Sequence, residues 1–177
     1  MGRGGGEATV IHATGPAPLA ATIERYAAGI PQTGILSPPT AGAPGGWDAL
    51  RARFGTRPAP ELFAAAISYA RDGFAATRRF CEYVAEKADL LTRDPAASVA
   101  YLPGGAPPRL GTTIRNAALA ATLEDLAEAG PDALYRGERG RALATFAARS
   151  GGLITTADLA ACRTEEGGTR CARPTPA

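Results

Sequence analysis

The sequence predicts a mainly helical chain with one short strand over residues 8–13. Trp47, Leu50 and Phe54 recur at i, i+3 and i+7, which places them on one face of a helix. Apolar residues return at helical spacing between Leu62 and Ala70 and form a second, broader stripe. Hydrophobic residues make up 45% of the chain but aromatic residues only 6%, so the helices are expected to pack through few large side chains.

The two stripes form a helical hairpin whose ends are marked in the sequence. Gly55 stands where the first helix ends, because a left-handed C-terminal residue costs glycine little. Pro60 suits the first turn of the second helix, where its missing N–H would have no partner anyway, and Gly73 closes that helix. Trp47 and Tyr69 lie on the apolar stripes, so we expect them in the core rather than at a ligand.

Further helices are predicted where a polar side chain can accept hydrogen bonds from the free amides of a first turn. The predicted caps are Thr22, Thr77, Asn116 and Thr155, and Asp94-Pro95 is expected to open a short helical turn. Thr155-x-x-Asp158 resembles a capping box with Asp in place of Glu. Gly140 is expected to weaken the helix that runs to about Ser150. Residues 30–46 are predicted to form a long loop, because turn-forming Gly and Pro occur throughout.

Charge and composition exclude several classes of function. The 177 residues carry a formal net charge of +2 with scattered arginines, unlike the clustered positive charge of a nucleic-acid-binding surface. No apolar run approaches the roughly 20 residues of a transmembrane helix. Residues 1–10 lack the apolar core of a signal peptide, so none is expected and the compartment stays open. Cys81, Cys162 and Cys171 are odd in number, so no disulfide framework is expected.

The spacing of polar residues predicts no catalytic, metal or cofactor site. His12 is the only histidine, and no nucleophile with an orienting acid accompanies it, so a structural or exposed histidine is favoured over a general base. Cys and acidic ligands are also missing near it, which makes it a poor metal site. The N-terminal GRGGGE resembles an anion-binding loop, but it lacks the P-loop lysine and does not lie between a strand and a helix.

Several stretches resemble, in the same order, segments of the γ-glutamyltransferase family. Residues 15–22, GPAPLAAT, resemble the family's AP-x-AAT segment, and residues 34–47 resemble its G-x-LSV-x-VPG-x-x-x-GW loop. Residues 62–74 end in ARDGF, as does the family's P-A-I-x-x-A-R-D-G-F helix. Residues 119–137 resemble LA-x-TL followed by GPDAFYRG, and residues 151–161 resemble GGLIT-x-EDLAAY. The matches imply a partial large-subunit region of this family.

The resemblance implies a fold and a reaction for the intact protein. Family members are N-terminal-nucleophile hydrolases of the αββα fold that cleave themselves into two subunits. They transfer a γ-glutamyl group from glutathione to an acceptor or to water through a Thr whose free amine serves as base. The chain is then a mainly α fragment of such a fold, with a small subunit as partner, γ-glutamyl compounds as ligands and no cofactor. Intact members are often periplasmic or extracellular.

The chain departs from the family at several places. The family's Arg that grips the substrate α-carboxylate falls at Thr14, and a threonine cannot replace a bidentate guanidinium. Thr14 is therefore expected to be a non-functional substrate-binding position. Residues 38–42, PPTAG, stand where the family has VTVPG, and Cys162 replaces its Tyr. No threonine of the chain lies in the family's nucleophile motif, so no catalytic residue is assigned.

These observations divide the chain into three parts. Residues 1–14 are a Gly-rich N-terminus with the short strand, and residues 15–162 are the partial large-subunit region. Residues 163–177 are expected to be a disordered tail unrelated to the family, of the kind an out-of-frame ending would produce. We expect a fragment of a γ-glutamyltransferase-like enzyme that is inactive alone. Two alternatives stay open: a stand-alone helical binding module, and one half of a two-chain acylase with another acyl specificity.

Overall fold

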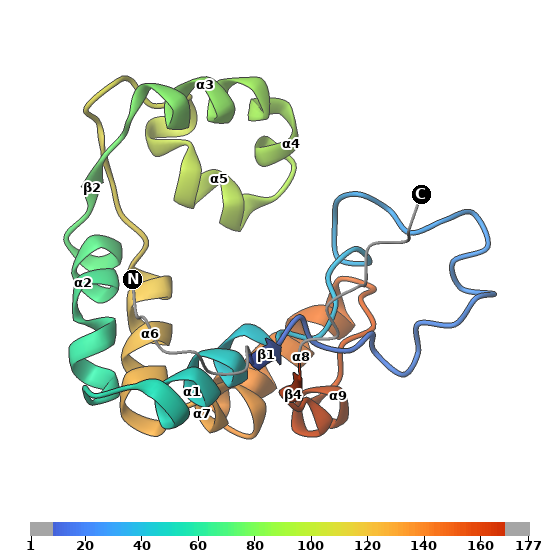
Figure 1. Cartoon of the computed structure of the whole chain (residues 1–177). Coiled ribbons are helices and arrows are strands. Elements are labelled where there is room, and N and C mark those ends of the chain that lie inside the picture. The colour runs from blue at the N-terminus through green and yellow to red at the C-terminus, as the bar shows by residue number, and fades with distance from the viewer. Residues whose placement is uncertain (1–8, 169–177) are drawn as a thin grey trace, which may run out of the picture. The chain divides into compact units, whose positions relative to one another are not determined.

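The computed structural model describes residues 9–168, which fall into two compact units (Figure 1). The first unit joins the described residues up to Arg57 with those from Ala129 onward, and the second is Pro58–Glu128. The predicted GRGGGE loop and Cys171 lie outside the described residues. None of the helices between residues 9 and 168 has the length and apolar character to cross a membrane.

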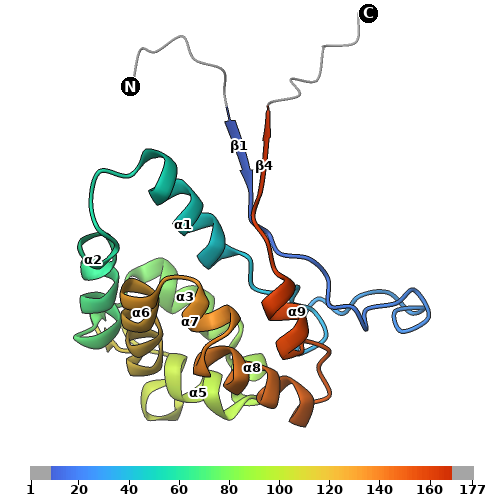
Figure 2. The same ribbon diagram turned by 90° about the horizontal axis from the view of Figure 1, so that it is seen from below.

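The first unit carries a two-stranded antiparallel ladder, visible in Figure 2. Its elements are β1 (Thr9–His12), α1 (Ala43–Phe54), α7 (Asp132–Tyr135), α8 (Glu138–Arg149), α9 (Thr156–Ala161) and β4 (Glu165–Gly168). His12 lies opposite Glu165, and Thr9 lies opposite Gly168. The predicted strand at 8–13 is confirmed as β1. The disorder expected from residue 163 is wrong for β4, because its backbone pairs with a strand at the other end of the chain, which local periodicity cannot reveal.

A small apolar core holds the helices of the first unit together. Ala147, Ile154 and Leu159 are buried in it, and Leu143 packs against them. Gly140 lies in the first turn of α8, where an added Cβ would overlap the Leu134 carbonyl oxygen. The glycine that the sequence marks as a weakness therefore allows α7 and α8 to approach each other closely.

The second unit has its own core between two long helices. Its elements are α2 (Ala59–Arg71), β2 (Phe74–Ala75), α3 (Arg78–Glu86), α4 (Ala88–Thr92), α5 (Pro95–Tyr101), the 3-10 turn η1 (Pro103–Gly105), β3 (Thr113–Ile114) and α6 (Ala117–Ala129, which ends one residue beyond the unit). Ala70 of α2 packs on Ala120 and Leu123 of α6, with Phe63 and Ile67 against them. β2 and β3 pair antiparallel.

Most of the predicted helix caps are confirmed. The Phe80 N–H donates to Thr77 Oγ1 at 3.3 Å, and the Ala97 N–H donates to Asp94 Oδ1 at 2.8 Å. The Leu119 N–H donates to Asn116 Oδ1 at 2.9 Å, and Thr155 begins a capping box. Gly73 follows α2 with a φ of 101°, the left-handed conformation expected of it. These caps depend only on neighbouring residues, which explains why the sequence predicts them.

Two local predictions are wrong. Gly55 ends α1 in an extended conformation with a φ of −75° and not in the left-handed one. An added Cβ on Gly55 would overlap the Arg51 carbonyl oxygen, so close packing rather than conformation favours glycine there. The Arg25 N–H does donate to Thr22 Oγ1 at 3.3 Å, but residues 22–26 form turns instead of a helix.

Several large apolar side chains predicted for the core are exposed. Trp47 of α1 is 47% exposed and Tyr69 of α2 is 63% exposed, so the prediction that both are core residues is wrong for this chain. Leu62 and Leu119, on α2 and α6, are also about half exposed. The predicted helical periodicity is correct, but the apolar stripe of each helix is wider than the part of it that packs against the rest of its own unit.

Candidate functional site

The place that the resemblance assigns to substrate binding lies just after β1. Thr14 is exposed there, and its Oγ1 lies 3.4 Å from Nε2 of His12. His12 is itself exposed, as the sequence predicts for a histidine without catalytic neighbours. A threonine and one histidine offer hydrogen bonds but no fixed positive charge. The loss of anion-binding capacity expected at Thr14 therefore stays a prediction that is compatible with this geometry.

A loop that precedes α1 packs tightly against the end of β1. The Thr40 N–H donates to the Pro16 carbonyl at 2.9 Å. Gly15 has a φ of 89°, and an added Cβ on it would overlap the Thr40 carbonyl oxygen. A Cβ on Gly42 would lie 2.5 Å from the Ala13 carbonyl oxygen. The two backbone segments meet so closely that neither glycine has room for a side chain.

Thr40 carries a buried hydroxyl without a partner among the described residues. Its side chain is fully buried, and its Oγ1 makes no hydrogen bond. Leaving such a group unpaired is costly, because its hydration is lost without replacement. The family has VTVPG where this chain has residues 38–42, so a Val without a hydroxyl stands at this place in the family.

Tyr135 at the end of α7 is hydrogen-bonded to the end of this loop and to the first turn of α1. The Gly45 N–H donates to the Tyr135 hydroxyl at 3.0 Å, and this hydroxyl donates to the Gly42 carbonyl at 3.2 Å. Burial raises the pKa of Tyr135 to about 12, the Gly45 N–H opposes this shift, and the neighbouring Cys162 side chain adds to it. Cys162 is buried, with its Sγ 3.9 Å from the Ala41 carbonyl oxygen. Tyr135 and Cys162 therefore support the loop and are not placed for chemistry on a ligand.

Asp158 of α9 joins two more segments of the first unit. It is only 5% exposed, and its carboxylate accepts hydrogen bonds from the Leu19 N–H and from Thr155. Burial alone would raise the pKa of Asp158, but the hydrogen bonds from Leu19 and Thr155 outweigh it and place this pKa below its usual range. The carboxylate is thus ionised and fully engaged within the protein.

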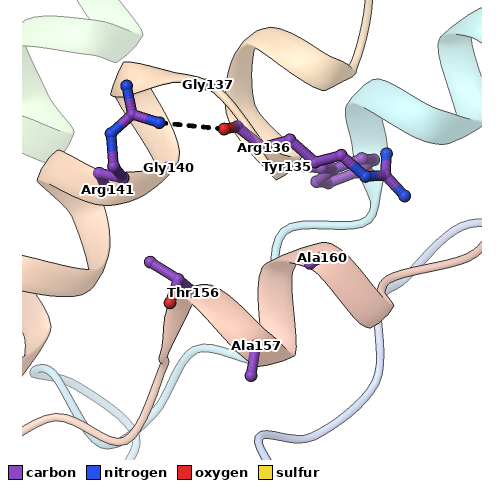
Figure 3. Close-up of a pocket in the computed structure, with 8 residues that line it drawn as sticks. All are labelled: Tyr135, Arg136, Gly137, Gly140, Arg141, Thr156, Ala157 and Ala160. Carbon is purple, nitrogen blue, oxygen red and sulfur yellow. Dashed lines mark hydrogen bonds between the residues drawn. The ribbon is translucent and has the colours of Figure 1, made fainter.

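An open hollow of about 470 Å³ lies between α7, α8 and α9 (Figure 3). Arg141 donates to the Arg136 carbonyl at 3.2 Å, and Arg136 pairs with Asp132. The rest of its lining is mostly Gly and Ala, with Thr156 and Tyr135 as the hydroxyl-bearing side chains. No His, Asp or Glu is among the residues that line this hollow, so its lining offers Thr156 no general base. Within residues 9–168, no three His, Cys, Asp or Glu side chains gather as metal ligands would.

The comparisons with known proteins identify the family. The family model described as Gamma-glutamyltranspeptidase matches residues 3–172. The chain belongs to the gamma-glutamyltranspeptidase family. Its predicted membership is confirmed. The match also runs past Cys162, so the prediction that the family resemblance ends there is wrong, and most of the tail shares in it.

Curated relatives extend over much of the chain. The Acylase ACY 1 proenzyme of Pseudomonas sp. (strain SE83) is 44% identical over 70% of the chain and 22% of its own length. The oxamate amidohydrolase proenzyme of Klebsiella pneumoniae is 38% identical over 92% of the chain and 32% of its own length. The glutathione hydrolase proenzyme of Escherichia coli is 31% identical over 76% of the chain and 23% of its own length. The chain thus spans between a fifth and a third of these relatives.

Solved structures confirm the fold class. The γ-glutamyltranspeptidase of Helicobacter pylori superposes with a TM-score of 0.84 at 22% identity, over 92% of this chain and 52% of that one. The cephalosporin acylase of Bacillus halodurans superposes with a TM-score of 0.82 at 30% identity, over 88% of this chain and 31% of that one. The mainly helical chain is therefore part of the fold that these N-terminal-nucleophile enzymes share.

Sequence spacing gave no sign of two residues that shape this site. Tyr135 stands in the GPDALYRG stretch and Asp158 in a capping box, but neither pattern says which distant backbone group each side chain reaches. Both contacts join residues separated by more than half of the chain. Only the fold brings the partners together.

Replacing Thr40 by Val should stabilise the protein. The methyl group fills the same space and removes a buried hydroxyl that lacks a partner, a gain of about 1 kcal/mol. The melting temperature should rise by roughly 3 °C. Differential scanning calorimetry of Thr40→Val measures this, with the exposed Thr156→Val as control. An unchanged or lower melting temperature for Thr40→Val would show that its hydroxyl has a partner.

Tyr135 should ionise late in the folded protein. Because its pKa is raised to about 12 from an ordinary value near 10, its contribution to stability is complete below about pH 10 and is lost as the pH rises toward 12. An absorbance titration of the five tyrosines should show one late step in the folded chain but none in urea. Tyr135→Phe should remove this step and Tyr101→Phe should keep it. The late step persisting in Tyr135→Phe would contradict the assignment.

Proposed function

We propose that this chain provides a large-subunit region of an acyl-transferring amide hydrolase. The observation that carries the proposal is the family match over residues 3–172, together with the fold shared with known N-terminal-nucleophile enzymes. The described residues bring no nucleophile, base and orienting acid together. The reaction therefore needs a nucleophile from outside them, which in this family is a threonine at the start of a small subunit.

The substrate of the assembled enzyme is proposed to carry an acyl group other than γ-glutamyl. Thr14 occupies the place where the resemblance puts an Arg for the α-carboxylate, and no fixed cation replaces it in the hydrogen bonds of Thr14. The identities to an acylase and an oxamate amidohydrolase, 44% and 38%, exceed the 31% to the Escherichia coli glutathione hydrolase. Both observations favour an acyl amide that lacks the amino-acid head group.

The purified 177-residue chain should not turn over any amide substrate on its own. γ-Glutamyl and butyryl p-nitroanilides are the probes, since the butyryl group has neither the α-carboxylate nor the α-amine. Release of p-nitroaniline should stay at the level of a heat-treated control. Adding the remaining part of a related proenzyme, with its nucleophilic Thr, should restore turnover and favour the butyryl probe. Thr14→Arg should shift the preference toward the γ-glutamyl probe, whereas Thr22→Arg, at another exposed position, should not.

Turnover by the chain alone would contradict the proposed need for an external nucleophile. A preference for the γ-glutamyl probe in the reconstituted wild type would contradict only the proposed acyl specificity. If the complementary part binds the chain but restores no turnover, the stand-alone binding module becomes the better account.

A further inference from the structure

The carboxylate of Asp158 divides its two oxygens between two segments. Oδ2 accepts from the Thr155 N–H at 2.8 Å and from Thr155 Oγ1 at 2.6 Å, which completes the capping box of α9. Oδ1 accepts from the Leu19 N–H at 2.8 Å. A helix cap uses only the first of these oxygens. The bond to Leu19 is additional and reaches a segment 139 residues away.

We propose that Asp158 is a positioning residue that holds residues 15–22, the segment following Thr14, against the start of α9. The inference rests on the proposed function only in giving this segment a role beside Thr14, the place that the resemblance assigns to substrate binding. The hydrogen bond itself can be tested on the chain alone, without substrate.

The Thr40 N–H fixes the start of this segment through the Pro16 carbonyl, but its second half, from Leu19 onward, has few other means of holding its position. The Leu19 side chain is 84% exposed, so burial of this residue does not anchor it, although Pro18 is buried. The Ala21 N–H donates to the Pro18 carbonyl at 2.9 Å, and the Thr22 N–H donates to the Ala20 carbonyl at 3.1 Å. These two bonds lie within the segment and do not connect it to a helix. The Leu19 bond provides that connection.

Only a carboxylate satisfies both sides of this arrangement. The groups that face Asp158 from Leu19 and from the Thr155 backbone are both N–H donors. An asparagine has one acceptor oxygen and one donor NH₂, so it can accept from only one of them and places a donor against the other. An asparagine can keep the Leu19 bond and lose only the Thr155 N–H, so Asp158→Ala, which removes both acceptor oxygens, is the variant that breaks the connection to Leu19.

Amide exchange measured by NMR on the ¹⁵N-labelled chain tests the proposal. In Asp158→Ala the Leu19 amide should exchange about tenfold faster or more, the factor expected from losing a hydrogen bond to a charged group. Thr155→Ala is the matched control, since it removes the cap hydroxyl but leaves Oδ1 free to accept from Leu19. It should weaken α9 while the Leu19 amide stays protected. The Ala147 amide, in the core of the first unit, reports global opening in each variant.

Two results of the amide-exchange experiment would overturn the proposal. One is an unprotected Leu19 amide in the wild-type chain, and the other is equal acceleration of the Leu19 amide in Thr155→Ala and Asp158→Ala. Leu19→Pro supplies a second test if Asp158→Ala unfolds, because it deletes the donor and leaves the capping box intact. Trypsin should then cut after Arg25 faster than in the wild type, with the Ala147 amide still protected. Cleavage after Arg25 at the wild-type rate would also overturn the proposal.

Discussion

The close contact between the end of β1 and the loop before α1 organises the first unit. Side chains are excluded where the two segments cross, because an added Cβ on Gly15, Gly42 or Gly46 would overlap backbone or Ala13 atoms. The backbone bond between Thr40 and Pro16 fixes how the two segments align. β1 therefore ends, and α1 begins, at positions set by this crossing. The exposed place of Thr14 lies directly beside it.

Two side chains from the C-terminal part of the chain secure the N-terminal segments around this crossing. Tyr135 bonds the end of the loop at Gly42 and the first turn of α1 at Gly45, and Asp158 holds the segment 15–22 at Leu19. β4 pairs with β1 and adds a third connection. Each contact joins distant parts of the sequence, so the segments on both sides of Thr14 are bonded to residues from the C-terminal part of the chain. The residues that make these contacts all lie within the range 3–172 that the family model matches.

Sequence reasoning succeeded where structure depends on neighbouring residues. The caps at Thr77, Asp94 and Asn116 and the left-handed Gly73 follow from local chemistry, and the mainly helical fold follows from periodicity. It failed where partners are distant. The sequence does not predict β4, because its partner β1 lies at the other end of the chain. Trp47 is exposed because the apolar stripe of α1 is wider than the surface that packs against it. The family resemblance can be identified from short matching stretches of sequence. Those stretches do not reveal that the match continues beyond Cys162.

The effect of a methyl group on Gly42 tests most directly whether the backbone crossing organises this unit. Gly42 has a φ of −86°, so Gly42→Ala adds no backbone strain and its effect is purely steric. Gly29→Ala is the control, because Gly29 has a φ of 92° and open surroundings, and its cost of roughly 1 kcal/mol is conformational strain. In urea unfolding followed by circular dichroism, Gly42→Ala should lower the midpoint much more than Gly29→Ala. A midpoint for Gly42→Ala equal to that of the wild type would contradict the account.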